Sequence, residues 1–403
     1  MPGVIRPTVD ANRLIDLARA LVRVPSTNQP AAGRSEAAAA ALIAECMRGL
    51  GWSPVVEEAA PGRPNLIAFV EGGLPGPTLM LEGHTDVVTE GDPTEWSHDP
   101  FGAEVVSGRL YGRGAADMKG GVAAMVFAAA AVAAAGPFPG RLLLAALADE
   151  EGLMLGAKDF VRRGHAAGVA AVIVCEPQGG EVGIAQKGAI RARIDALGSM
   201  AHGAMPDQGR NPITPLAELV ARCRRLEADL QFEAGEHPLL GRPYITPTLI
   251  EAGSPNQLNV IPATGRLGLD IRTTPAVDHA GLLERLSVMC SDGLDGLSMT
   301  VIDDRPPTQT PVDHPVVQAV IEAHRKIHDQ TPILGGVPGT TDGTILWRDA
   351  GVPCVTYGPG GKWIAHQVDE YVELDDLVRS AQVYAEAARL FLSVGIESSS
   401  VRV

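Results

Sequence analysis

The stretch Arg141-Leu142-Leu143-Leu144-Ala145-Ala146-Leu147-Ala148 leads directly into Asp149-Glu150-Glu151, and this junction decides how the chain is interpreted. The unbroken apolar run predicts a buried strand, and the acidic residues stand where that strand reaches the surface. Because successive side chains of an extended segment point to opposite sides, the two glutamates can divide two tasks. One can bind a metal ion while the other stays free to move a proton.

The segments around this strand alternate between helical and extended patterns. Helices are expected at residues 14–24, 37–50, 122–135 and 157–163, and strands at 65–70, 78–81, 142–147 and 171–174. Strands that alternate with helices predict an α/β fold, in which a mixed, mostly parallel sheet is flanked by helices. In such a sheet, functional side chains belong at the carboxyl ends of the strands.

The pattern changes near Lys187 and changes back after residue 308. Between these points we expect strands at 189–197, 245–251, 266–272 and 298–303, and helices at 215–230 and 281–290. That order predicts a small two-layer α+β domain. A helix at 316–328 and a strand at 352–357 then resume the first pattern. A chain of 403 residues exceeds what one core usually supports. We therefore predict a catalytic domain formed by residues 1–187 and 304–403, with residues 188–303 inserted into it.

Composition narrows the classes of function. The chain has 33 Lys+Arg against 48 Asp+Glu, a net charge of -15, which argues against binding to nucleic acid or to anionic membranes. The longest apolar run, residues 122–135, is shorter than the roughly 20 residues of a membrane span, and residues 1–23 lack a signal-peptide core. The five cysteines are scattered without CxxC spacing, which indicates reduced thiols. We expect a cytoplasmic protein with neither a nucleic-acid nor a membrane partner.

Side chains that can bind a metal recur just after the predicted strands and in nearby loops. Taken singly, each would more often be a helix cap or a surface residue, but several positions at one rim of a sheet are much less expected by chance. They are His84, Asp86, Asp117, Glu150, Glu151, Glu176 and His366. Imidazole and carboxylate ligands suit two zinc ions, and one carboxylate can bridge ions about 3.5 Å apart. Asp86 has two possible interpretations. Its carboxylate can accept a hydrogen bond from the other ring N–H of His84, or it can form an Asx-type turn.

Short motifs then carry a resemblance to a known family. They are Gly83-His84-Thr85-Asp86-Val87-Val88, residues 112–121, Asp149-Glu150-Glu151-Gly152 and Cys175-Glu176-Pro177. In order and spacing they resemble the di-zinc amidohydrolase and peptidase family that includes acetylornithine deacetylase, succinyl-diaminopimelate desuccinylase, aminoacylase and glutamate carboxypeptidase. The match continues through residues 201–206, 259–262, 339–343, 358–360 and 365–370. It therefore covers essentially the whole chain.

The resemblance implies a set of metal ligands. Asp117 would bridge two zinc ions in each subunit, with cobalt or manganese as possible substitutes. His84 and Glu176 would complete one site, and Glu151 and His366 the other. The peptide bond that follows Asp117 is expected to be cis. The family also implies a zinc-peptidase-like catalytic domain and, for the insert, a ferredoxin-like domain that serves as a lid and holds a homodimer together.

Further roles are implied for residues beside the metals. Glu150 would be the general base for a water that bridges the ions, and Asp86 the hydrogen-bond partner of His84. His202 would reach across from the partner subunit and stabilise the oxyanion. Its sequence position alone would instead indicate a histidine in a surface loop. Arg272 would meet the substrate carboxylate or pair with a surface acid. The substrate pocket would also include Asn259, Gly339 and Thr340, while the glycines of that loop fit simple turns equally well.

The expected function is hydrolysis of the amide bond of N-acyl amino acids, or of related small amides with a free carboxylate. A glutamate-type carboxypeptidase or dipeptidase is the enzymatic alternative, because the same site cleaves either bond. An inactive metal-binding dimer is the other alternative, but it would need neither Glu150 nor His202. Gly198-Ser199-Met200 stands where many relatives have a basic residue, and Gly152-Leu153-Met154 replaces a more polar stretch. Both departures argue against the biosynthetic deacetylase or desuccinylase in particular.

Overall fold

The structure of the protein, a computed structural model, describes residues 7–27, 29 and 32–397. The chain forms two compact units. The first contains the residues up to Ala185 together with Gln309–Val337 and the chain from Thr341 onward. The second contains Gln186–Thr308 and the short segment Pro338–Thr340.

The first unit is built on a nine-stranded sheet with the order β1-β2-β6-β3-β7-β17-β8-β15, in which β16 also pairs with β8. Its strands are β1 (Val55–Ala60), β2 (Arg63–Glu71), β3 (Gly73–His84), β6 (Phe138–Leu147), β7 (Val169–Val174), β8 (Val182–Gln186), β15 (Thr308–Gln309), β16 (Leu334–Val337) and β17 (Cys354–Thr356). The neighbours β6, β3, β7 and β17 run parallel, whereas β1 with β2, β2 with β6, and β17 with β8 are antiparallel. A mixed α/β fold with a parallel centre is confirmed.

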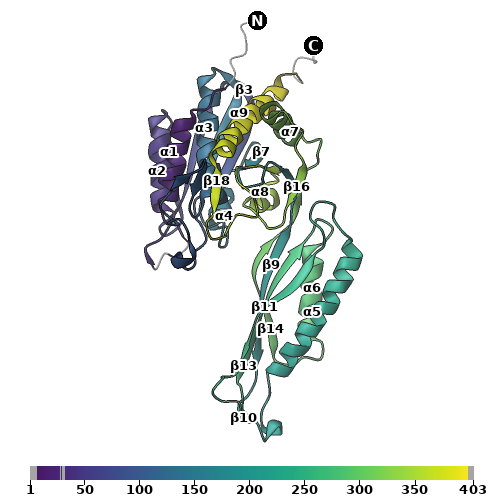
Figure 1. Ribbon diagram of the computed structural model, residues 1–403. Coiled ribbons are helices and arrows are strands. Elements are labelled where there is room, and N and C mark those ends of the chain that lie inside the picture. Colours follow the sequence, from purple (N-terminus) through teal and green to yellow (C-terminus); the bar gives the residue numbers. More distant parts are fainter. Residues whose placement is uncertain (1–6, 28, 30–31, 398–403) are drawn as a thin grey trace. The chain divides into compact units, whose positions relative to one another are not determined.

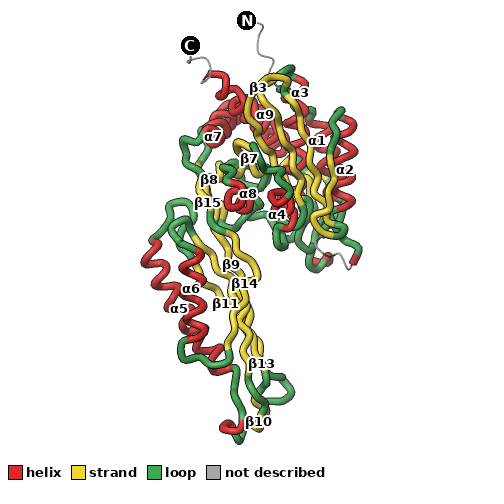
Figure 2. Tube along the Cα trace, turned by 180° about the vertical axis from the view of Figure 1, so that it is seen from behind, coloured by secondary structure: helices red, strands yellow, loops and turns green. Residues whose placement is uncertain are grey.

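Helices cover both faces of this sheet (Figures 1 and 2). They are α1 (Ala11–Val22), α2 (Ala37–Gly49), α3 (Gly120–Ala134), α4 (Leu155–Arg162), α7 (Pro315–His328), α8 (Gly343–Ala350) and α9 (Leu374–Glu397). α3 and α9 pack on one face, and α4 and α8 on the other. β6 lies between these layers, so Leu142 and Leu144 are buried on one side while Leu143 and Leu147 are buried on the other. This double burial explains the unbroken apolar run of the strand.

One helical segment among the described residues, Ala115–Ala134, is long and apolar enough to cross a membrane. It exceeds the apolar run counted in the sequence, because a π-helical turn at Ala115–Lys119 leads into α3. Of the residues in its apolar window, 89% are buried inside the protein. The alanines and glycines of this segment therefore allow close packing in the core of the first unit.

The second unit has two layers. A four-stranded antiparallel sheet with the order β11-β13-β9-β14 carries α5 and α6 on one face (Figure 2). Its elements along the chain are β9 (Gly188–Leu197), α5 (Ile213–Ala234), β11 (Tyr244–Ala252), β13 (Thr264–Thr273), α6 (His279–Ser291) and β14 (Leu297–Arg305). Alternate residues of β9 and β13, such as Ile190 and Leu267, pack against Leu219 and Leu286 of the helices. A small two-stranded sheet, β10 (Ala201–His202) with β12 (Val260–Ile261), belongs to the same unit.

Candidate metal centre

Neighbouring parallel strands position two of the first candidate ligands. β3 ends at His84, which lies opposite Leu147 at the end of β6. The amide of Thr85 continues this pairing by donating to the carbonyl of Leu147 at 2.9 Å. On the other side of β3, the amide of Cys175 donates to the carbonyl of Glu82 at 2.9 Å, so Glu176 leaves β7 beside His84. Side chains that follow separate strands in sequence thus meet at one edge of the sheet.

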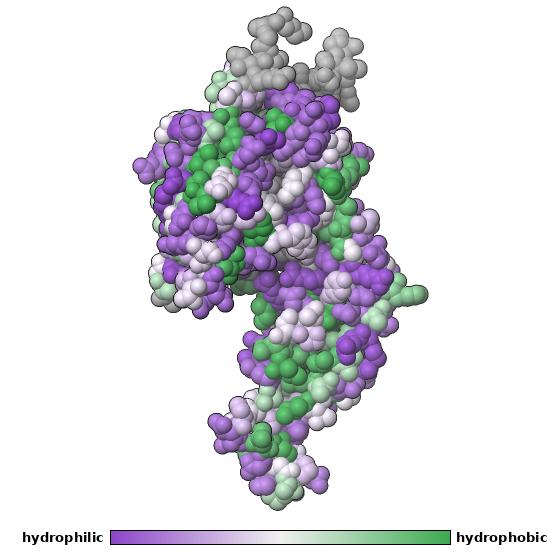
Figure 3. All heavy atoms as spheres, in the orientation of Figure 1, coloured by the Kyte–Doolittle hydropathy of each residue, from purple (hydrophilic) through white to green (hydrophobic). Residues whose placement is uncertain are grey.

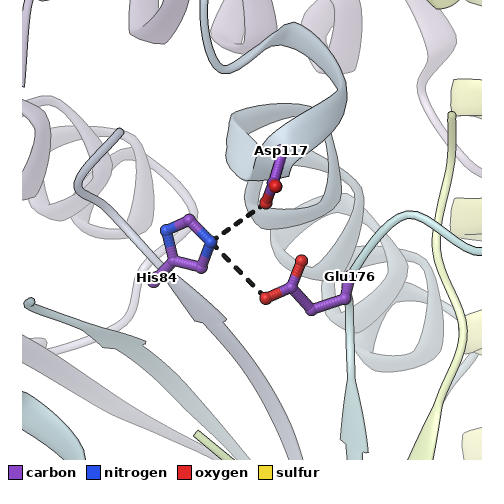
Figure 4. Close-up of side chains that lie close together, drawn as sticks. All are labelled: His84, Asp117 and Glu176. Atoms are coloured by element: carbon purple, nitrogen blue, oxygen red, sulfur yellow. Dashed lines mark hydrogen bonds and ion pairs between the residues drawn. The ribbon is translucent and has the colours of Figure 1, made fainter. Parts of the chain in front are cut away.

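The first group of candidate ligands is His84, Asp117 and Glu176, which we call the His84 site (Figure 4). The Nε2 atom of His84 lies 3.1 Å from Oδ1 of Asp117 and 3.5 Å from Oε1 of Glu176. His84 is 1% exposed. Two glycines let the backbone approach Glu176 closely, since a Cβ at Gly121 or Gly358 would come within 2.1 or 2.4 Å of the carbonyl oxygen of Cys175.

The second group is Asp117, Glu151 and His366, which we call the His366 site. Nε2 of His366 lies 2.8 Å from Oε1 of Glu151 and 3.2 Å from Oδ2 of Asp117. The side chain of His366 is 51% exposed. Asp117 therefore turns one carboxylate oxygen to each histidine, which is the arrangement that a bridging ligand needs. In each group the ligand atoms lie within 4.8 Å of one another.

The peptide bond between Asp117 and Met118 is cis, as the family resemblance implied. Asp117 departs from helical backbone angles inside the turn Ala115–Lys119 (φ −117°, ψ 95°). The sulfur of Met118 accepts the amide of His84 at 3.3 Å. The segment that carries Asp117 is thereby attached to the end of β3.

Asp86 holds both glutamates of the acidic stretch. Its Oδ1 accepts the amide of Glu150 and its Oδ2 the amide of Glu151, each at 3.1 Å. Nδ1 of His84 lies 3.0 Å from the main-chain carbonyl of Asp86 and 3.5 Å from its carboxylate. The shorter contact of the ring is thus to the backbone. The carboxylate orients the turn that carries the predicted base.

Asp149 has a structural task that the sequence did not reveal. Its backbone is left-handed (φ 67°), which costs energy for a residue other than glycine. The side chain is 2.6 Å from Nη1 of Arg63 and also accepts the amide of Leu153 at 3.0 Å. Arg63 forms a second buried ion pair with Glu36, whose carboxylate accepts the amide of Asp149 at 3.1 Å. These contacts fix the turn from which Glu150 and Glu151 project.

Burial and crowding shape the charges of the site. Burial, followed by the charge of Asp117, raises the pKa of Glu176 to about 8. Burial also raises the pKa of Glu150 well above its usual range. Hydrogen bonds to Asp117 and Glu151 raise the pKa of His366 to about 10. The candidate donor set consists of three acidic side chains and two imidazoles, which are ligand types suited to divalent cations. A bound cation would favour the ionised carboxylates and the neutral rings.

A further buried acid pair lies beside the His84 site. Glu82 is 1% exposed, and its pKa is raised well above the usual range by burial and then by the charges of Asp342 and Glu176. Asp342 stands at the N-terminus of α8. We did not select either residue from the sequence, although Glu82 in the middle of an apolar strand was a visible signal.

The remaining predicted residues all belong to the second unit. The amide of Gly203, next to His202, donates to the carbonyl of Asn259 at 2.7 Å, so His202 and Asn259 lie side by side. Arg272 donates from Nε and Nη2 to the carboxylate of Asp270 at 2.6 and 3.1 Å. The hydroxyl of Thr340, which follows Gly339, accepts from Nη1 of Arg305 at 3.2 Å.

Several known proteins are similar to this chain over most of its length. The chain is 33% identical over 392 residues to the succinyl-diaminopimelate desuccinylase of Rhodospirillum centenum (92% of this chain, 95% of the relative). It is 29% identical over 404 residues to the N-formyl-4-amino-5-aminomethyl-2-methylpyrimidine deformylase of Bacillus subtilis (92% of each). The M20 family metallo-carboxypeptidase Sso-CP2 of Sulfolobus solfataricus has a similar fold, with a TM-score of 0.81 and 21% identity over 94% of this chain and 99% of that one. Residues 80–390 match the peptidase family M20/M25/M40. The chain belongs to this family and is a metal-dependent amidohydrolase.

Proposed function

We propose that the protein is a two-metal amide hydrolase that removes the acyl group from small N-acyl amino acids or related amides with a free carboxylate. The observation that carries this proposal is the pair of ligand groups that share Asp117, with Glu150 beside them. Zinc is the proposed ion, since its usual ligands are of these types, and cobalt or manganese are possible substitutes. The two sequence relatives support deacylation, because both are named for removal of an acyl group.

The residues of the first unit have distinct tasks in this reaction. Bound divalent ions would polarise the scissile carbonyl and lower the pKa of a bound water. The carboxylate of Glu150 takes a proton from the attacking water and returns it to the departing nitrogen. Burial favours the protonated form of Glu150, which suits a group that holds the proton between these two steps. Asp86 keeps Glu150 in place through its amide.

The proposed task of the second unit is to complete the site of a partner subunit. His202 would donate a hydrogen bond to the oxyanion, and the protein would form a homodimer through this unit. Large apolar side chains are exposed near His202, among them Met200 (65%), Met205 (55%) and Leu258 (92%). Figure 3 shows hydrophobic residues gathered on the surface of this unit, toward its β10 end. Such exposed apolar residues favour contact with another protein surface.

Arg272 is proposed to bind the substrate carboxylate. Asp270 already engages Nε and Nη2 of this guanidinium, which orients the fork and leaves Nη1 for a ligand. Asn259, Gly339 and Thr340 are proposed to line the same pocket. The acyl group stays open, because the departures at residues 152–154 and 198–200 speak against the biosynthetic deacylases. We also place the protein in the cytoplasm, in line with five free cysteines.

A substrate panel tests this proposal. The zinc-loaded protein would be incubated with N-succinyl-diaminopimelate, N-acetylornithine, N-acyl aromatic amino acids, a folate-type glutamyl amide and simple dipeptides. Release of free amine from at least one N-acyl amino acid is expected, with Glu150→Gln as the inactive control. Cleavage of the peptides alone would favour the carboxypeptidase or dipeptidase alternative. Inactivity on the whole panel, with metal bound, would support the inactive metal-binding dimer.

A further inference from the structure

The two ligand groups are held in different ways. His84 is the last residue of β3 and Glu176 follows β7, so the sheet fixes their backbones. His366 instead lies in an irregular loop, where its own backbone (φ 65°) and that of Asp369 (φ 57°) are left-handed. Residues other than glycine keep such angles only when their surroundings constrain them. The His366 loop therefore needs anchors of its own.

One anchor is the carboxylate of Glu370, which is fully buried. Its Oε1 accepts the amides of Ala116 and Asp117, both at 3.0 Å. Its Oε2 accepts a hydrogen bond from Nη1 of Arg113 at 2.6 Å. Glu370 thus connects the start of the bridging-ligand segment with a buried guanidinium.

Arg113 carries the connection on to the histidine loop. Its Nη2 donates to the main-chain carbonyl of His366 at 3.3 Å, and its Nη1 to that of Gln367 at 3.2 Å. Arg113 is 2% exposed, and its guanidinium lies 5.1 Å from the ring centre of Trp96. One buried ion pair therefore contacts the backbones of Asp117 and His366, two of the three ligands of the His366 site.

A short sheet brings the two charged residues together. β5 (Arg109–Tyr111) pairs with β18 (Tyr371–Glu373), with Tyr111 opposite Tyr371. The amide of Gly112 then donates to the carbonyl of Glu370 at 2.9 Å. This pairing sets Glu370 beside Arg113, although 257 positions separate them in sequence.

We propose that Glu370 and Arg113 are positioning residues that set the distance between Asp117 and His366, and so control the affinity of the His366 site separately from that of the His84 site. This inference rests on the two-metal centre of the proposed function. Neither side chain touches the metals in this proposal. They act through backbone groups of the ligands, as groups around metal sites commonly do.

Glu370→Gln is the principal test. The amide side chain keeps the shape of Glu370 but has one acceptor oxygen in place of two, while three donors face it. If the oxygen stays on the amides of Ala116 and Asp117, the new NH₂ group meets the guanidinium of Arg113 and releases the His366 loop. The second ion should then bind roughly 10- to 100-fold more weakly, while the first ion keeps its affinity.

Arg113→Lys tests the other end of the pair. Lysine keeps the positive charge beside Glu370 but lacks the fork that reaches two carbonyls. Weaker binding of the second ion alone is expected here too. The matched control is Glu373→Gln, because Glu373 pairs with Arg109 at 2.7 Å on the same two strands, with both side chains exposed (41% and 45%). This control should bind both ions as the wild type does.

The measurement is a calorimetric titration of the metal-free proteins with zinc alone, together with the free energy of unfolding of each variant. No substrate is needed. Two ions of wild-type affinity in both Glu370→Gln and Arg113→Lys would overturn the proposal, and so would equal weakening of both ions with a matching loss of stability. If Glu370→Gln does not fold, Arg113→Lys decides. Fewer than two ions in the wild type would overturn the two-metal centre itself, and the positioning role with it.

Discussion

The two units present their functional residues in opposite ways. In the first unit, His84, Asp117 and Glu176 are buried at strand ends and loops, and Nε2 of His84 lies 3.1 and 3.5 Å from the two carboxylates. In the second unit, His202 is exposed, and Arg272 is engaged by its own neighbour Asp270. The sheet of the first unit thus preorganises a reaction centre. The second unit offers side chains near its surface, and the tasks proposed for them depend on a substrate or on a partner subunit.

The largest expected effect is a loss of proton transfer in the first unit while metal binding is kept. Glu150→Gln should lower kcat by roughly 10² to 10⁴, because the amide cannot accept the proton of the attacking water. Bound metal should be retained, since the two ligand groups do not include Glu150. Steady-state kinetics with metal analysis checks both points. A variant with near wild-type kcat would remove Glu150 from the mechanism.

Mixing two inactive proteins tests whether the second unit acts in trans. Glu150→Gln subunits and His202→Ala subunits should regain activity when they exchange, because a mixed dimer contains one site with both residues intact. Random pairing at equal concentrations would restore about a quarter of the wild-type activity. The assay follows activity against time after mixing, with each variant alone as control. No recovery in dimers shown to exchange would count against action in trans.

Many of the candidate site residues of the first unit could be predicted from the sequence, for a physical reason. Three candidate ligands of the first unit, His84, Glu151 and Glu176, lie at or just after the ends of apolar strands such as β6, and strand ends are visible in a local pattern. The supports are not local. Arg63 reaches Asp149 across 86 positions, and Arg113 reaches Glu370 across 257. Such pairs form only when the sheet is assembled, so no local pattern predicts them.

The fold shows the same division between features that a local sequence pattern predicts and features that depend on distant partners. The strands at the centre of each sheet were predicted near their observed places, whereas short edge strands such as β16 (Leu334–Val337) were not. Edge strands depend on distant partners, here β8. The 24-residue helix α9 was also absent from our expectations. Its buried Leu377, Ala381, Tyr384 and Ala388 recur at helical spacing, so this pattern was present in the sequence and was not used.

The two candidate metal-binding histidines of the first unit, His84 and His366, should differ in what they contribute to stability. His84→Ala leaves Asp117 and Glu176 buried without their imidazole, and should lower the free energy of unfolding of the metal-free protein by about 3 kcal/mol. His366→Ala removes a half-exposed ring and should cost about 1 kcal/mol or less. Urea unfolding in the presence of a chelator measures both. Equal losses would mean that the sheet does not constrain His84 more tightly than the loop constrains His366.

The smallest expected effect concerns acid sensitivity in the first unit. Burial, followed by the charge of His328, lowers the pKa of His324 to about 4. Its Nδ1 lies 2.9 Å from the hydroxyl of Tyr357, and its ring stacks on His328 at 4.2 Å. In the unfolded chain this imidazole binds a proton near pH 6.5. The unfolded state is therefore favoured as the pH falls from 6.5 toward 4, and the stability that the neutral ring contributes above pH 6.5 is lost.

His324→Gln keeps a polar partner for Tyr357 but cannot titrate. Between pH 7.5 and 5, the free energy of unfolding of the wild type should therefore fall more than that of the variant. The difference is at most about 2 kcal/mol, and solvent screening should reduce it to about 1 kcal/mol. Comparing metal-free proteins at both pH values cancels the titration of the ligand groups, which the two proteins share. Parallel pH dependence would show that His324 is protonated in the folded protein as readily as in the unfolded chain, so that its burial carries no acid sensitivity.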